Sequence, residues 1–240
     1  MLLHTRRLAT LARSWRLFLS FFKEQTSPDE FYLPLARDTA ALVTALHRDC
    51  GLPLPYTLVD VGSGPGYFQG AFAPATYISV DPYEPADIRA DGRNLPFATG
   101  SIDCAMSSNA AEHVANWQQM GDEMVRVTKP GGLIIVSYTI WLGPFGGHET
   151  GLWQHYLGGT YARDRYERTH GHPPKNVFGE SLFAVSCAEG LRWAENQPNA
   201  ELLAAFPRYH PQWAWWVTHV PLLREFLTSN LVIALKKAES

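Results

Sequence analysis

The sequence predicts an α/β fold built on a mainly parallel sheet, and two observations lead to this expectation. Five short apolar runs of strand character alternate with segments of helical periodicity. The first run, Leu58 to Val61, passes directly into Gly62, Gly64 and Gly66. Because glycine has no Cβ, a ligand can lie against the backbone there. The turn after this strand is therefore a predicted binding site.

Asp60 distinguishes this turn from the two common phosphate-binding loops. A dinucleotide-binding loop has the spacing G-x-G-x-x-G, whereas this chain has G-x-G-x-G beside a carboxylate. No Lys-Ser or Lys-Thr follows the last glycine, so the loop is not a P-loop. A carboxylate repels phosphate, and the site favours a nucleoside with a positively charged tail. A glycine-rich turn without any ligand is the alternative.

Apolar runs that end at turns predict further elements along the chain. A second strand runs from Thr76 to Asp81 and stops at Pro82. An acid about 20 residues past a glycine loop binds ribose hydroxyls in nucleoside-binding folds, which makes Asp81 a candidate; a solvated strand-end carboxylate is the alternative. The other expected elements are a strand within Ser101 to Asn109, a helix from Met120 to Thr128 and a strand from Leu133 to Tyr138.

These motifs together resemble those of the class I S-adenosylmethionine-dependent methyltransferases. The resemblance rests on the loop from Asp60 to Gly66, the strand-end Asp81, the D-x-x-x-L-P-F run from Asp91 to Phe97, Glu112-His113-Val114, and R-V-x-K-P-G-G from Arg126 to Gly132. It implies a Rossmann-like, mainly parallel seven-stranded sheet. Glu201 to Arg208 and Asn230 to Lys236 would supply its last two strands, with the final one antiparallel.

A narrower resemblance covers the segment after the fifth expected strand. Trp141 to Glu149, His155 to Gly159 and Pro174 to Gly179 look like parts of a mycobacterial and actinobacterial methyltransferase group. The implied organisation is N-terminal amphipathic and cofactor-lid helices over residues 1–50, and a methyltransferase domain over 51–240. A substrate-side insertion is expected at about residues 141–200.

The resemblance also implies S-adenosylmethionine as the cofactor and assigns its contacts. Asp60 and the glycine backbone would hold the methionine amino group, Asp81 the ribose, Asp91 and Gly92 the adenine, while Asn109 would face the methyl group. Pro65 shapes the loop but has no N–H to donate. The expected cofactor residues are Tyr32, Asp60, Gly62, Ser63, Gly64, Gly66, Tyr67, Asp81, Pro82, Asp91, Gly92 and Asn109.

On the acceptor side, an attacking hydroxyl loses its proton as the new bond forms, and histidine is a suitable general base. His113 and His148 are the candidates, with Glu112 or Glu149 orienting or replacing them. The alternative is that Glu112 and His113 simply open a helix. The residues expected to bind the substrate are His155, Tyr156, Arg163, Tyr166 and Lys175. The spacing of the histidines matches no standard metal site, so we expect no metal.

The first 23 residues contain five cationic side chains and no acidic one. Leu8, Leu11, Trp15, Phe18, Leu19 and Phe22 recur at intervals of three or four, which predicts a basic amphipathic helix. Such a helix can lie on an anionic membrane, or it can pack on the domain or a second subunit. A secretory signal lacks support, and a mitochondrial presequence fits the composition but not the bacterial resemblance.

Composition narrows the remaining choices. A chain of 240 residues with 46% hydrophobic residues suits one α/β domain, and a net charge of −3 argues against a general nucleic-acid binder. The three cysteines have no paired spacing, which favours a reducing, cytoplasmic location. Trp213, Trp215 and Trp216 either pack beneath the sheet or meet lipid or a partner. The oligomeric state stays open.

The expected function is methyl transfer to a small polar or amphiphilic acceptor, such as an oxygen of a cell-envelope glycolipid or saccharide precursor. Two other functions remain open. One is a scaffold that binds S-adenosylmethionine at a membrane surface without turnover. The other is a nicotinamide-dependent reductase, which the glycine spacing disfavours.

Overall fold

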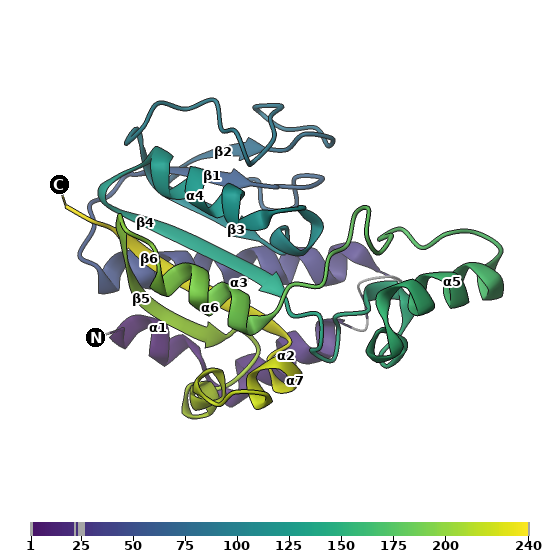
Figure 1. Ribbon diagram of the computed structural model, residues 1–240. Helices are drawn as coiled ribbons and strands as arrows, with labels where there is room; N and C mark the ends of the chain where they lie inside the picture. The colour runs from purple at the N-terminus through teal and green to yellow at the C-terminus, as the bar shows by residue number, and fades with distance from the viewer. Residues whose placement is uncertain (1, 22, 24–26, 240) are drawn as a thin grey trace.

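Parallel strands form the centre of the structure, as the alternating pattern predicts. The computed structural model describes residues 2–21, 23 and 27–239. Its strands form one sheet in the order β2-β1-β3-β4-β6-β5, with β6 antiparallel to both neighbours (Figure 1). The strands are β1 Thr57–Val61, β2 Thr76–Val80, β3 Ile102–Ser108, β4 Thr128–Thr139, β5 Ala200–Pro207 and β6 Asn230–Lys237.

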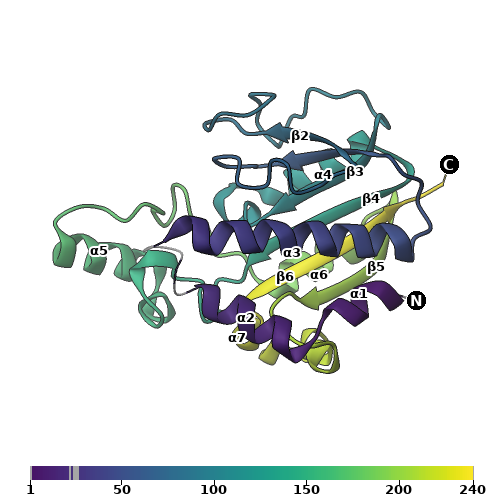
Figure 2. The same cartoon turned by 180° about the vertical axis from the view of Figure 1, so that it is seen from behind.

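Helices cover both faces of this sheet. One face carries α4 and α6, and the other carries α3 with α1 and α2 (Figures 1 and 2). The α-helices are α1 Leu3–Leu8, α2 Leu11–Phe21, α3 Pro28–Asp49, α4 Trp117–Val127, α5 Gly159–His170, α6 Cys187–Glu195 and α7 Leu223–Leu227. The 3-10 helices are η1 Ala111–His113, η2 His148–Thr150, η3 Gln154–Leu157 and η4 Gln212–His219.

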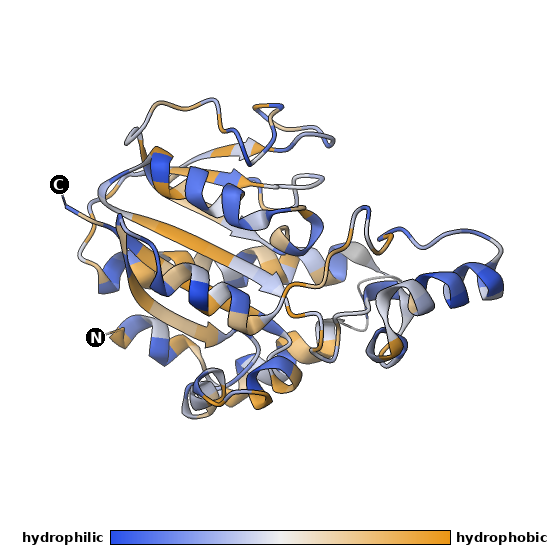
Figure 3. Ribbon diagram, viewed as in Figure 1, coloured by the Kyte–Doolittle hydropathy of each residue, from blue (hydrophilic) through white to orange (hydrophobic). Residues whose placement is uncertain are grey.

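The core is divided between the two faces because side chains alternate along a strand. Val59 and Val61 of β1 belong to an apolar cluster with Met124 of α4, whereas Leu58 belongs to a cluster with Leu46 of α3. The central strands are correspondingly apolar along their length, while α5 is hydrophilic and extends away from the sheet (Figure 3). The α/β architecture and the antiparallel last strand are confirmed.

One of the seven expected strands, between β2 and β3 in the chain, is reduced to one bridge. Within the described residues the sheet has six strands, and Ile88 forms an isolated parallel bridge with Val80 beside β2. Two backbone bonds form the bridge, from the Ile88 N–H to the Ser79 carbonyl at 3.0 Å and from the Asp81 N–H to the Ile88 carbonyl at 3.2 Å. Side-chain bonds add to it, because the Asp87 carboxylate accepts the Ser79 N–H at 2.9 Å and the Asp87 N–H donates to Ser79 Oγ. The two prolines of this segment, Pro82 and Pro85, cannot donate at all.

The N-terminal segment forms two helices, not the single helix that the apolar spacing predicts. α1 ends at Leu8 and α2 begins at Leu11. At the break, the carbonyl of Ala9 accepts the Gln212 N–H of η4 at 2.8 Å, which diverts the chain toward the C-terminal part of the molecule. The helical segment expected to follow it within residues 1–50 is α3, which begins at Pro28 and contains Pro34.

The predicted apolar stripe of α2 is divided between protein and solvent. Leu17 is buried, and Phe18 of the stripe contacts Phe145 with ring centroids 5.5 Å apart. Leu11, Trp15 and Leu19 are 63%, 62% and 47% exposed, and Phe22 lies outside the described residues. The helix therefore packs on the domain while part of its apolar stripe stays exposed. Among the described residues, none of the helices has the length and apolar character needed to cross a membrane.

A buried ion-pair network fixes α2 to the domain. Arg13, one of the cationic residues of the predicted basic helix, is buried and binds Asp38 of α3 with two bonds, Nε to Oδ1 at 2.6 Å and Nη2 to Oδ2 at 2.7 Å. Its Nη1 donates to the carbonyl of Arg208, 3.1 Å away. Arg208 is itself fully buried and donates to Thr39 and to Ser108 Oγ. α2 is therefore anchored by charge as well as by apolar contact.

The C-terminal tryptophans are divided between the two expected environments. Trp215 stacks on Phe206 of β5, with ring centroids 4.2 Å apart. Trp213 and Trp216 are 70% and 53% exposed. One of the three rings thus packs beneath the sheet while the other two face solvent.

Removing Asp38 tests the anchoring network. We expect Asp38→Ala to lower the free energy of unfolding by about 3–5 kcal/mol, because two buried guanidinium groups lose their carboxylate. Urea denaturation measures the change. Glu239→Gln is the matched control, since it breaks an exposed ion pair with Lys236 and is expected to cost less than about 1 kcal/mol. Equal effects of the two substitutions would contradict this role of Asp38.

Candidate active site

The glycine loop after β1 has the backbone that its sequence predicts. Gly62, Gly64 and Gly66 have φ angles of +75°, +58° and +84°. A Cβ on Gly62 would lie 2.6 Å from the Cβ of Ala110, so only glycine fits there. A Cβ added to Gly64 or Gly66 would meet no atom of another segment within 4 Å, so their side of the loop is open. The loop is therefore held closely on one side and accessible on the other.

The segment after the loop matters for its ligand. All residues from Gly62 to Ala75 are described, and they form a series of turns with no helix. The loop consequently lacks the helix N-terminus that would stabilise a pyrophosphate. This geometry does not suit the dinucleotide mode of binding.

Two carboxylates lie beside the loop. Asp60 is buried and accepts the Tyr77 hydroxyl at 2.5 Å, and burial raises the pKa of its carboxyl to about 7 despite that bond. Asp81 accepts the N–H of Gly64 at 3.0 Å through Oδ2, and the N–H groups of Tyr83 and Glu84 through Oδ1. Asp81 thus fixes the loop while keeping part of its capacity to accept, since a carboxylate offers about four acceptor positions.

Four further predicted residues lie in the loop or beside it. Tyr32 of α3 stacks on Tyr67 with ring centroids 4.5 Å apart and nearly parallel planes, which brings the lid helix against the end of the loop. The hydroxyl of Ser63 is buried and has no hydrogen-bond partner within the described structure. Asn109 has a φ of +54°, and its Oδ1 accepts from Asn230 at 2.7 Å. These residues come from four separate segments and meet at the carboxyl ends of the strands.

Asp91 and Gly92 belong to a segment beside the carboxyl end of β1. A Cβ on Gly92 would approach Val61 to 2.7 Å, which places the segment directly against the end of β1. Asp91 is partly exposed and pairs with Arg93, 2.6 Å away, and this pairing lowers the pKa of its carboxyl. The carbonyl of Pro82 accepts a hydrogen bond from Arg89 Nε, 3.0 Å away. Arg89 lies just before this segment in the chain.

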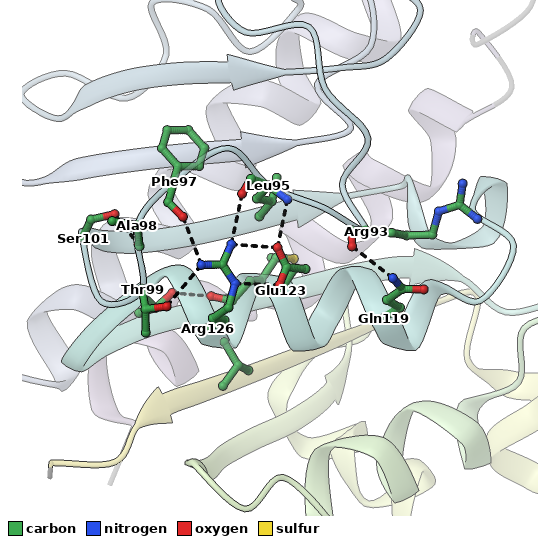
Figure 4. Close-up of polar contacts among 12 residues, drawn as sticks. Arg93, Leu95, Phe97, Ala98, Thr99, Ser101, Gln119, Glu123 and Arg126 are labelled. Carbon is green, nitrogen blue, oxygen red and sulfur yellow. Dashed lines mark hydrogen bonds and ion pairs between the residues drawn. The ribbon is translucent and has the colours of Figure 1, made fainter.

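A clamp beneath this segment has no counterpart among the sequence-based expectations. Arg126 of α4 donates to the carbonyls of Leu95 and Phe97, each at 3.0 Å, and pairs with Glu123 at 2.6 Å (Figure 4). Glu123 in turn accepts the Leu95 N–H. The sequence does contain a signal for this clamp, because Arg126 is the first residue of the R-V-x-K-P-G-G motif. The clamp positions the D-x-x-x-L-P-F run against α4.

Three of the four predicted catalytic residues come together. Ligand-type atoms of Glu112, His113 and His148 all lie within 4.8 Å of one another. Glu112 and His113 form η1, which follows β3, and His148 opens η2. Glu112 Oε1 accepts the N–H of Thr139 at 2.9 Å. Glu112 Oε2 and His148 Nε2 are buried without a hydrogen-bond partner within the described structure.

The two imidazoles of this cluster differ in their surroundings. His113 Nδ1 lies 2.7 Å from the carbonyl of Ser181. Burial, together with the neighbouring His113 and His155, lowers the pKa of His148 to about 3, so its ring is neutral. Glu149 does not belong to this cluster. Its carboxylate accepts both the N–H and the side-chain amide of Asn176.

The predicted substrate residues are dispersed over the insertion between β4 and β5. His155 is buried, and its Nε2 lies 3.2 Å from the carbonyl of Gly143. Tyr156 next to it is 43% exposed. Arg163 pairs with Asp164 on α5, and Tyr166 stacks on His170. Lys175 is exposed. The extension of α5 away from the sheet separates its residues from the glycine loop (Figure 1).

Comparisons with known proteins agree with this arrangement. Residues 59–136 match the family model described as a methyltransferase domain. An uncharacterized methyltransferase of Mycobacterium tuberculosis is 55% identical over 250 residues, covering 95% of this chain and 96% of its own length. One of Mycobacterium marinum is 56% identical over 248 residues, with the same coverage.

Solved structures share the fold at low sequence identity. The CurJ carbon methyltransferase has a TM-score of 0.52 and 11% identity, covering 94% of this chain and 59% of that one. A S-adenosylmethionine-dependent methyltransferase of Thermotoga maritima has a TM-score of 0.50 and 18% identity, covering 93% and 99%. These two likenesses concern the fold alone.

The raised pKa of Asp60 predicts a pH-dependent stability. Between about pH 4 and its folded pKa of about 7, the folded chain keeps a proton that the unfolded chain has released. The contribution of this group is therefore largest below pH 4 and falls by about 1.4 kcal/mol per pH unit as the pH rises toward 7. Urea denaturation from pH 5 to 8 measures it. The Asp60→Asn variant has no carboxyl group at this position, so its free energy of unfolding should lack this dependence on pH. The same dependence on pH in both proteins would contradict the raised pKa of Asp60.

Proposed function

Since the chain belongs to the class I S-adenosylmethionine-dependent methyltransferases, we propose that it methylates an oxygen of a small polar or amphiphilic acceptor. A cell-envelope glycolipid or saccharide precursor is the acceptor class that we favour. The observation that carries the proposal is the position of Glu112, His113 and His148. They follow the carboxyl ends of β3 and β4, next to the cofactor loop, and two of their buried polar atoms have no partner within the described structure.

The residues around the loop fit the family's cofactor. The buried carboxylate of Asp60 suits the methionine ammonium group, and the remaining acceptor position of Asp81 suits a ribose hydroxyl. Ser63 has a buried hydroxyl without a partner, and the open side of Gly64 and Gly66 leaves room for close approach. Asp91 and Gly92 would flank the adenine, while Tyr32 and Tyr67 would cover the methionine side.

The bound cofactor supplies a methyl group on a sulfonium sulfur. An aligned lone pair of the acceptor can attack the methyl carbon and displace the sulfur. The chain's part is to hold the acceptor oxygen in line and to keep water away. Asn109 borders this region, and its side chain is fixed by Asn230. Glu112 Oε2 and His148 Nε2 are the atoms available to take the hydroxyl proton, and Ser181 orients His113 through its carbonyl.

An exposed apolar surface supports an amphiphilic acceptor and a peripheral membrane location on the cytoplasmic face. Leu11, Trp15 and Leu19 form an exposed stripe on α2, and Arg16 on the same helix is exposed. The hydrogen bond between Ala9 and Gln212 links this helix to η4, which presents Trp213 and Trp216. Apolar side chains beside arginines are the combination that binds anionic lipid.

The two other functions are less well supported. The turns after Gly66 give no helix N-terminus for a nicotinamide dinucleotide. A scaffold that binds the cofactor without turnover has no need for the unpartnered buried groups of Glu112 and His148. Turnover with an acceptor separates the scaffold from the enzyme.

Mass spectrometry of an envelope extract tests the proposed function. We expect incubation with the protein and S-adenosylmethionine to give lipid or saccharide species one methyl group heavier.

Asp81→Asn is expected to weaken cofactor binding by about tenfold or more, because it loses a charge-assisted acceptor. Calorimetry measures this binding.

The Glu112→Gln variant separates an effect on catalysis from an effect on cofactor binding. It keeps an oxygen for the Thr139 N–H but loses the carboxylate, so we expect unchanged cofactor binding and turnover lower by about 10²–10⁴-fold. Cofactor binding without any methylated product in the extract would favour the scaffold and refute the enzyme.

Vesicle sedimentation tests the membrane surface. We expect the protein to bind phosphatidylglycerol vesicles more strongly than phosphatidylcholine vesicles, and Trp15→Ser with Leu19→Ser to abolish the binding. Leu54→Ser is the control, since Leu54 is similarly exposed but precedes β1, away from α2. Identical sedimentation of the double variant and the control would refute this surface.

A further inference from the structure

We propose that Glu112, His113 and His148 bind one divalent transition-metal ion, and that Zn²⁺ suits their donor atoms best. The role of the ion rests on the proposed function, but its binding does not. The sequence spacing predicts no metal because the three residues come from two segments far apart in the chain. The fold brings these segments together at the carboxyl edge of the sheet.

The donor set matches a transition-metal site. One carboxylate oxygen and two imidazole nitrogens lie within 4.8 Å of one another. Two histidines and one glutamate are a known ligand set of catalytic zinc, while Mg²⁺ and Ca²⁺ prefer oxygen alone. Zinc bonds of about 2.0–2.2 Å place tetrahedral ligands roughly 3.4 Å apart, so small side-chain rotations complete the site.

Two of the three side chains have unsatisfied atoms that a cation would satisfy. Glu112 is 1% exposed, and Oε1 is occupied by the Thr139 N–H while Oε2 has no partner within the described structure. His148 Nε2 is likewise buried and unpartnered. Buried polar atoms are nearly always satisfied, so two such atoms in one cluster point to a ligand.

The surroundings also resemble those of metal ligands. His113 Nδ1 lies 2.7 Å from the Ser181 carbonyl, and such a bond on one ring nitrogen orients the other toward a metal. His148 has a φ of +48°, a backbone conformation that costs energy for histidine and that is retained mainly at functional sites. Within the described residues, this is the one group of three His, Cys, Asp or Glu ligand atoms with such spacing.

Three protein ligands leave a position open for the acceptor. An acceptor hydroxyl bound there becomes more acidic and releases its proton to solvent. Its oxygen then forms a bond to the methyl carbon as the bond from that carbon to sulfur breaks, leaving a neutral thioether. With the ion bound, Glu112 and His148 would be its ligands, in place of the base role proposed for them without a metal.

Cobalt titration tests the site without any need for turnover. Tag-free, full-length protein freed of metal by a chelator is titrated with Co²⁺ and followed by its visible absorption. We expect one Co²⁺ per chain, displaced by Zn²⁺ and unaffected by Mg²⁺. Glu112→Gln and His148→Asn should each weaken Co²⁺ binding by about 100-fold or more, at least as much as the loss of a group that only hydrogen-bonds to a metal ligand. Asparagine tolerates the positive φ of position 148.

The control is the double variant His170→Asn, His172→Asn, which removes two exposed histidines from the same insertion. It should bind Co²⁺ as the parent does, and circular dichroism verifies the fold of every variant. No Co²⁺ spectrum in the parent, or full binding by folded Glu112→Gln and His148→Asn, would overturn the metal site. Methyl transfer by a protein without this spectrum would leave the proposed function standing, whereas Co²⁺ binding without transfer would leave the metal site standing.

Discussion

The close approach of Gly62 to Ala110 is the contact on which the site depends. A single added methyl group at position 62 would meet Ala110 at 2.6 Å. Ala110 immediately precedes η1, which carries Glu112 and His113. The glycine loop and the segment that carries Glu112 and His113 are therefore fixed relative to each other by this close contact. Flexible side chains are not needed to set this spacing.

Burial of negative charge is the second requirement of this site. Asp60 lies in the interior with its pKa raised to about 7 by burial, and Asp81 is used to hold the loop. Burial of the Asp60 carboxylate costs folding free energy, whereas three backbone N–H groups satisfy Asp81. Two carboxylates beside the loop favour a cationic ligand, such as a sulfonium nucleoside, over an anionic dinucleotide.

The sequence predicted the sheet and the backbone of the glycine loop well because both depend on local patterns. Apolar runs located β1, β2 and β3, and glycine spacing located the loop. Prediction failed where distant residues decide the outcome. The sequence predicts a basic amphipathic helix, but Arg13 of this helix is buried by its contacts with Asp38 and Arg208. Likewise, no pattern could show that the Asp87 side chain would bond to Ser79 beside β2. Glu112, His113 and His148 were predicted as catalytic residues, and the structure brings them together, although their spacing gave no indication of a metal site.

The network of Arg13, Asp38 and Arg208 has a consequence for how this family can diverge. Each of the three side chains is buried, and the Asp38 carboxylate lies between the two guanidinium groups, 2.6 Å from Arg13 Nε and 3.6 Å from Arg208 Nη2. Loss of Asp38 leaves two buried cations without a counter-ion, whereas loss of either arginine leaves the other one paired with the carboxylate. Homologues that keep either arginine should therefore keep the acid, and a relative that has lost α2 should still carry the Asp38 and Arg208 pair or replace both residues together.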